Sequence, residues 1–177
     1  MNTQAFAMAM ALMAVGYSYA PSALASAREN QRLTTCAVSI NGSGSAEGGL
    51  TLPSAAARDL ARAGARAGRR GWRVQVGSDL QPCHASSVQI AFHDSGNVNA
   101  QGRLDNVGSA ERVDVVLINL NDGGADINLR TGANSQVRII PPMTGFVILN
   151  YAAEYYATGS AGGGLVSTSV QYDLIYR

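Results

Sequence analysis

The chain has 177 residues, which suffice for one domain of ordinary size and a short processed segment. Apolar residues make up 46% of the sequence and charged residues only 14%, so the chain can bury a sizeable core. The formal net charge of +1 excludes a global electrostatic field that would steer the protein toward nucleic acid or an acidic partner.

The first 25 residues have the pattern of an export signal. Small and apolar residues fill positions 5–15, and the small-residue pattern at positions 23–25 fits signal-peptidase cleavage before Ser26. The apolar run is too short to span a bilayer, although the basic residues that usually precede such a run are missing. We expect residues 1–25 to be a signal peptide and the protein to be exported; a buried N-terminal helix is the alternative.

The chain contains two cysteines, Cys36 and Cys83. Two cysteines in an exported protein indicate one disulfide, and the alternative is a pair of separate buried thiols. A zinc site is not expected, because the cysteines lack CxxC spacing and the chain has only two histidines, His84 and His93. We expect no metal and no cofactor.

From Cys36 onward, short segments alternate between apolar and polar residues, a pattern typical of β-strands. Turn residues separate the segments, and about seven to nine strands at this spacing predict a β-sandwich or a barrel. The expected strands cover residues 36–40, 50–52, 72–76, 88–92, 113–120, 137–140, 146–156 and 170–176.

One segment, residues 54–70, differs because it is rich in alanine and arginine, with Ser54 placed to cap a helical turn. Its arginines form a candidate basic patch, but no aromatic residues alternate with them and the rest of the chain adds no basic surface. We expect a solvated surface loop or short helix, and no nucleic-acid partner. The arginines are Arg58, Arg62, Arg66, Arg69 and Arg70.

The sequence carries none of the common catalytic or nucleotide-binding motifs, so we do not expect an enzyme. His93 and Asp94 are adjacent, but neighbours on a strand point to opposite faces, and we interpret them as a strand end followed by a turn. The acidic and amide residues around Asp122 and Asp126 hint at calcium. They lack the spacing of an EF-hand loop, and residues 121–124 fit a hairpin turn better.

The C-terminal third is the most informative region. A tyrosine-rich segment ends in Ala157-Thr158-Gly159, a glycine-rich link follows, and the last strand alternates up to a penultimate tyrosine, Tyr176. This order resembles the major-pilin family of type 1 and P-like fimbriae, in which a glycine lies fourteen residues from the end, as Gly164 does here. The likeness covers about residues 36–177, including both cysteine-containing segments.

The resemblance implies an all-β fold: an incomplete immunoglobulin-like β-sandwich, the pilin fold, that is completed by donor-strand exchange. The missing strand leaves a groove beside the last strand, which a chaperone and later a neighbouring subunit would fill. Residues 26–35 would be a short N-terminal extension and residues 36–177 the pilin domain. The groove residues implied are Gly164, Val170, Tyr172, Leu174 and Tyr176.

The family further implies a structural subunit of a chaperone–usher fimbria that supports cell adhesion. Its partners would be a periplasmic pilus chaperone, an outer-membrane usher and neighbouring pilin subunits. Its route would lead through the periplasm to the cell-surface fimbrium.

The N-terminal extension departs from the family pattern. Residues 26–35 contain one large apolar residue, Leu33, and no glycine, whereas the family's donor extensions are longer and alternate. Such a chain would accept a strand better than it donates one, which suits a tip or terminating subunit, unless cleavage occurs earlier or the gene starts elsewhere. A glycan-binding adhesin module is a further alternative. Its candidate sugar platforms would be Trp72, Tyr155 and Tyr156, although we expect these aromatic residues to pack in the core.

Overall fold

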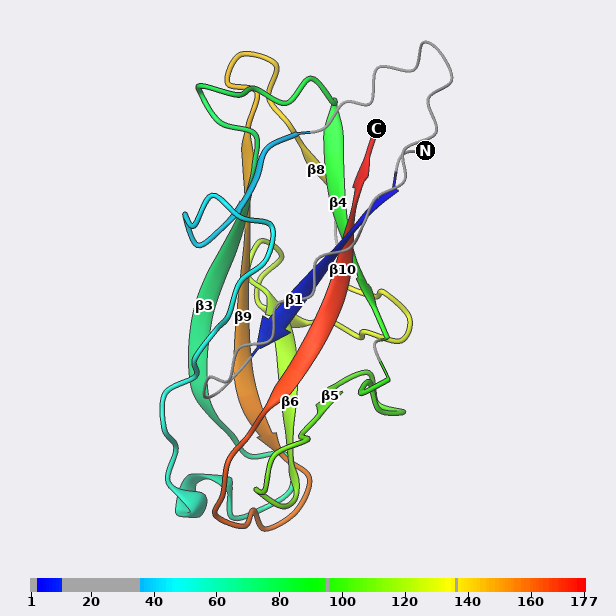
Figure 1. Cartoon of the computed structure of the whole chain (residues 1–177). Helices are drawn as coiled ribbons and strands as arrows, with labels where there is room; N and C mark the ends of the chain where they lie inside the picture. Colours follow the sequence, from blue (N-terminus) through cyan, green and yellow to red (C-terminus); the bar gives the residue numbers. More distant parts are fainter. Residues whose placement is uncertain (1–2, 11–35, 95, 136) are drawn as a thin grey trace, which may run out of the picture.

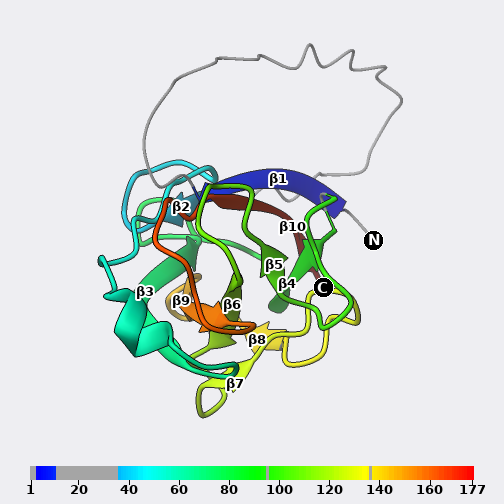
Figure 2. The same ribbon diagram turned by 90° about the horizontal axis from the view of Figure 1, so that it is seen from below.

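Two antiparallel sheets pack face to face in this protein (Figures 1 and 2). The computed structural model describes residues 3–10, 36–94, 96–135 and 137–177, and of residues 3–10 the backbone alone. The N-terminal extension predicted at residues 26–35 and the predicted cleavage site therefore lie outside the described residues. No helix in the described ranges is long and apolar enough to cross a membrane.

The first sheet has four strands in the order β1-β10-β4-β8, and each strand is antiparallel to its neighbours. Its strands are β1 (Thr3–Met10), β4 (Ser87–His93), β8 (Val137–Ile139) and β10 (Thr168–Tyr176).

The second sheet has six strands, in the order β2-β3-β9-β6-β5 with the short β7 paired to β6. Neither sheet returns to its first strand, so the described part of the chain is an open sandwich and not a closed barrel. The strands are β2 (Val38–Ile40), β3 (Arg66–Val76), β5 (Leu104–Asp105), β6 (Val113–Asn119), β7 (Ala125–Asp126) and β9 (Val147–Ala157).

The hydrophobic pattern explains the place of each long strand. All seven residues of β6 are buried, as its nearly continuous apolar sequence predicts for a strand in the middle of a sheet. The period-two alternation of β10 is confirmed from Ser169 to Tyr172, because Val170 and Tyr172 are fully buried while Ser169 and Gln171 are exposed. Leu174 is fully buried as expected, but Asp173 beside it is buried as well.

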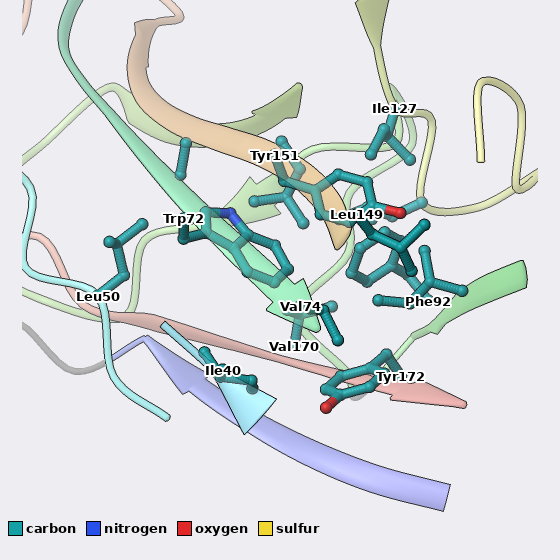
Figure 3. Close-up of a cluster of buried hydrophobic side chains, with 14 of the residues drawn as sticks. Ile40, Leu50, Trp72, Val74, Phe92, Ile127, Leu149, Tyr151, Val170 and Tyr172 are labelled. Carbon is teal, nitrogen blue, oxygen red and sulfur yellow. The ribbon is translucent and has the colours of Figure 1, made fainter. Parts of the chain in front are cut away.

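Three aromatic rings join the two sheets at the centre of the core (Figure 3). Trp72 on β3 packs against Tyr151 on β9, with ring centroids 4.9 Å apart, and Phe92 on β4 meets the edge of Tyr151 at 5.8 Å. Tilted and edge-on pairs of this kind stabilise a core beyond the area that they bury. The expectation that Trp72 packs in the core is confirmed.

The predicted disulfide between Cys36 and Cys83 is present, and both residues are buried. Cys36 lies just before β2, and Cys83 lies in the connection between β3 and β4. The disulfide therefore joins the start of the domain at Cys36 to the β3–β4 connection, where the chain crosses from one sheet to the other.

One expectation about secondary structure was wrong, and a second holds only in part. Residues 50–52 form no strand: Leu50 and Leu52 are buried, but they belong to a segment with no regular backbone pairing in the described part. In residues 54–70 the expected short helix forms as the 3-10 helix η1 (Ala57–Leu60), but β3 already begins at Arg66.

The start of β3 explains why Arg66 and Arg69 are not a free basic patch. Glu154 on the adjacent strand β9 is only 3% exposed, and a buried carboxylate requires charged or hydrogen-bonding partners. Arg69 Nε donates to Glu154 at 2.7 Å, and Arg66 Nη1 donates to Glu154 at 3.1 Å and to Asp126 at 2.8 Å. Hydrogen bonds to Asp126 and Glu154, respectively, raise the pKa of Arg66 and Arg69 above the ordinary arginine value.

The disulfide should contribute measurably to stability, because it closes a loop with a sequence separation of 47. We expect the double variant Cys36→Ser/Cys83→Ser of the full-length chain to lose about 4 kcal/mol of unfolding free energy, the chain-entropy value for such a loop. Urea unfolding of the oxidised protein and the variant, followed by tryptophan fluorescence, measures the difference. Equal midpoints and slopes would contradict this role.

Candidate functional site beside the last strand

The last strand, β10, has a different kind of partner on each edge. On one edge it pairs with β4, from Gln171 opposite His93 to Tyr176 opposite Val88. On the other edge it pairs antiparallel with β1, from residue 3 opposite residue 175 to residue 10 opposite residue 168 (Figure 1). The chain's own N-terminal segment therefore covers this edge in the full-length protein.

This pairing differs from the expectation of an open edge. The sequence led us to expect residues 1–25 to act only as an export signal, yet residues 3–10 form a β-strand along β10. A short run of small apolar residues is compatible with either structure, which explains the difference. Because β1 lies wholly inside the predicted signal peptide, an open edge in the mature chain stays a prediction.

Three of the five predicted groove residues lie together on the side of β10 that faces the core. Val170, Tyr172 and Leu174 are each 0% exposed, and Figure 3 shows Val170 and Tyr172 near Ile40 of β2, between the two sheets. The hydroxyl of Tyr172 donates to the carbonyl oxygen of Ala46 at 2.6 Å. This hydrogen bond holds the core-facing side of β10 against residues 45–48, the segment that precedes the buried Leu50.

The fourth predicted residue, Tyr176, lies partly buried at the end of β10. Burial raises the pKa of Tyr176 to about 12, because the phenolate form loses hydration there. Burial likewise raises the pKa of Tyr172, with further contributions from the neighbouring Tyr176 and Glu47. Both tyrosines are therefore held neutral at every physiological pH.

The fifth residue, Gly164, lies before β10 and not along it. A Cβ atom at this position would come within 2.6 Å of the Ala110 backbone nitrogen, and its φ of 154° is rare for residues with a side chain. Gly164 lines a hollow of about 320 Å³, which we call the terminal hollow. Its other lining residues include Leu60, Val113 and Leu165. The hollow lies beyond the last pair of β1 and β10, at the end where β10 begins.

One contact at the site was not predicted from the sequence. His93 Nε2 lies 2.6 Å from Asp173 Oδ2, across the pairing of β4 with β10. The two residues are 80 positions apart, and no local pattern connects them. The turn predicted after His93 is confirmed, because Asp94 Oδ1 accepts a hydrogen bond from Gly96 N at 2.8 Å.

The acidic and amide residues that suggested a calcium site form a turn and an ion pair instead. Gly124 N donates to Asn119 O at 3.1 Å between β6 and β7, and Asp126 pairs with Arg66. Over the described ranges, no group of three or more histidine, cysteine, aspartate or glutamate side chains is placed to hold a metal ion.

The remaining sugar-platform candidates also have structural partners. Tyr155 is buried in the core. Tyr156 lies on the outer side of the second sheet, where Arg103 and Arg66 stack over its ring at 4.1 and 5.4 Å. The expectation of core packing holds for Tyr155, whereas Tyr156 packs beneath charged side chains.

Comparison with known proteins places this β-sandwich in a family. The chain is 32% identical over 155 residues to the major fimbrial subunit SMF-1 of Stenotrophomonas maltophilia (strain K279a), which covers 84% of this chain and 89% of that protein. The protein belongs to the family of fimbrial subunits. The same chain is also 31% identical over 134 residues to the F17 fimbrial protein of Escherichia coli, and the match covers 72% of this chain and 74% of that protein.

The fold of this fimbrial subunit is shared with the P pilus rod subunit PapA. The two structures have a TM-score of 0.57 at 16% identity, with 81% of this chain and 99% of the other covered. The expected immunoglobulin-like pilin fold and the resemblance to fimbrial pilins are confirmed. No family model matches the sequence.

The raised pKa values predict how the stability of the fimbrial subunit depends on pH. An unfolded tyrosine titrates near pH 10, so the stabilising effect of a neutral buried tyrosine is complete below about pH 10 and is lost as pH rises toward the folded value. We expect Tyr176→Phe to reduce the loss of unfolding free energy between pH 9 and pH 11 by about 1 kcal/mol. Urea unfolding at both pH values tests this, and an unchanged pH dependence in the variant would contradict it.

Proposed function

We propose that the mature chain is a fimbrial subunit that becomes complete only when a β-strand from another polypeptide pairs with β10. One observation carries the proposal: the second edge of β10 is covered by residues 3–10, which belong to the predicted signal peptide. Removal of residues 1–25 would therefore leave β10 paired with β4 alone.

An uncovered edge of β10 would destabilise the mature subunit in two ways. The eight residues of β1 pair along β10, and without them a row of backbone donors and acceptors would face solvent. The side chains of Val170, Tyr172 and Leu174 would also lose cover, and each large apolar side chain that is fully buried typically contributes about 1.5–3 kcal/mol. A mature subunit alone would be marginally stable and prone to bind strands.

A chaperone and an usher fit this requirement. Addition of a strand to an exposed sheet edge is a common mode of protein recognition, in which main-chain hydrogen bonds give affinity. We propose that a periplasmic chaperone first covers β10 and that, at an outer-membrane usher, the N-terminal extension of a neighbouring subunit replaces it. The mature chain thereby passes through the periplasm to the cell-surface fimbrium, where it acts as a structural subunit without catalytic activity.

A second candidate is a tip or terminating subunit. The predicted extension at residues 26–35 has one large apolar residue, Leu33, and such a strand would fill a groove poorly. The adhesin alternative has less support, because Trp72 and Tyr155 are buried and Tyr156 lies under two arginines.

Truncation at the C-terminus tests the proposed strand acceptor. We expect removal of residues 174–177 to abolish recovery of a chaperone complex from the periplasm, because the truncation shortens β10 where it pairs with β4. The matched control is Gln171→Ala, a change at an exposed position of the same strand, which should leave recovery unchanged. Co-purification with a tagged chaperone measures both.

A folded control separates strand capture from folding. The refolded full-length chain, in which β1 covers β10, should not bind the chaperone, whereas the mature chain should. The mature chain should also form ladders that resist unheated sodium dodecyl sulfate when it assembles. Normal recovery of the truncated variant, or equal capture of full-length and mature chains, would contradict the proposal; capture without ladders would favour the terminating subunit.

A further inference from the structure

We propose that successive copies of this chain in the fibre also pack body to body, with Leu80 and Met143 of one copy against Val107 and Leu165 of the next. The proposal rests on the proposed donor-strand function and identifies a contact that the strand pairing itself does not specify. Its occupant is a second copy of the same chain.

The first surface is the cysteine end, formed by residues 77–83 and 141–145 (Figure 1). Cys83 N donates to Gly145 O at 2.7 Å, which joins these two loops. The disulfide holds Cys36 to Cys83, so the domain that begins at Cys36 begins at this end. Any strand that this copy donates must therefore start from the cysteine end.

Two large apolar side chains project from the cysteine end. Leu80 is 94% exposed and Met143 is 99% exposed, so neither packs into the core of its own copy. Single exposed apolar residues are ordinary, but two on adjoining loops at the exit of the donated strand mark a candidate contact surface.

The second surface is the hollow end, formed by residues 106–112 and 158–167 at the opposite end of the sandwich (Figure 1). Val107 N donates to Ser167 O at 2.8 Å and Ala110 N donates to Leu165 O at 2.9 Å, which joins these two segments. Val107 is 69% exposed and Leu165 is 56% exposed, and Leu165 also lines the terminal hollow.

The direction of strand pairing brings these two ends together. β1 runs antiparallel to β10 and finishes with Met10 opposite Thr168, at the hollow end. A strand from another copy that takes the same path would emerge at the hollow end and continue to Cys36 of its own copy. The cysteine end of the donor would then face the hollow end of the acceptor.

The length of the extension makes the contact close. Ten residues lie between the predicted cleavage site and Cys36, and β1 pairs over eight residues. A donated strand of equal length leaves 10 − 8 = 2 residues before Cys36. Two extended residues span at most about 7 Å, so the two bodies cannot separate.

The composition of the extension favours the same arrangement. Leu33 is the one large apolar residue in it, so the donated strand buries little apolar surface. A contact between apolar side chains of the two bodies adds burial that the strand lacks. Because the contact joins different surfaces of identical copies, each added copy presents the same free surface to the next, as a growing fibre requires.

Cross-linking tests this contact. We expect the variant Leu80→Cys/Leu165→Cys, assembled into fibres and oxidised, to give covalent multimers after boiling in non-reducing detergent. The matched control is Leu120→Cys/Leu165→Cys. Leu120 is 42% exposed, and its backbone nitrogen donates to Asn150 O within β9, so it lies on the flank of the second sheet and not in either end surface. This control should give at least ten-fold fewer multimers. Peptide mapping verifies that the disulfide between Cys36 and Cys83 is intact in both variants.

The outcomes separate the two proposals. Ladders before heating, without covalent multimers above the control after heating, would leave donor-strand assembly standing and overturn the body contact. The absence of any ladder before heating in the wild-type mature chain would overturn self-assembly, and with it a second copy as the occupant.

Discussion

The structure depends on what pairs with β10. This strand carries three fully buried side chains, Val170, Tyr172 and Leu174, and it needs a neighbour on each edge to keep its backbone paired and its core side covered. β4 supplies one neighbour and residues 3–10 supply the other. Those residues fall within the predicted signal peptide, so the proposed removal of that peptide would leave the fold incomplete.

Much of the fold was predictable from local pattern. Period-two alternation located β4, the centre of β3 and β10, and the continuous apolar run located β6, because burial on one or both faces leaves a direct mark on the sequence. The start of β3 at Arg66 was not predictable in this way. Its partners are Glu154 and Asp126, which are distant in sequence, and the alanines and arginines around it favour a helical turn by themselves.

The candidate site was predictable to a similar degree. Alternation correctly indicated Val170, Tyr172 and Leu174 as one buried face, whereas Gly164 lies at the terminal hollow and not along the strand. The pair of His93 with Asp173 depends on the register of β4 against β10, which no local pattern encodes. The strand formed by residues 3–10 was missed because its apolar residues fit an export signal equally well.

Complementation with a peptide measures the central claim most directly. The chain starting at Ser26 is unfolded thermally with and without a synthetic peptide of residues 3–10, with a scrambled peptide of the same composition as the control. The account predicts low stability alone and, at a peptide concentration 100 times the dissociation constant, a gain of about 2.7 kcal/mol that the scrambled peptide does not give. A chain from Ser26 that is as stable as the full-length protein and does not respond to the peptide would contradict it.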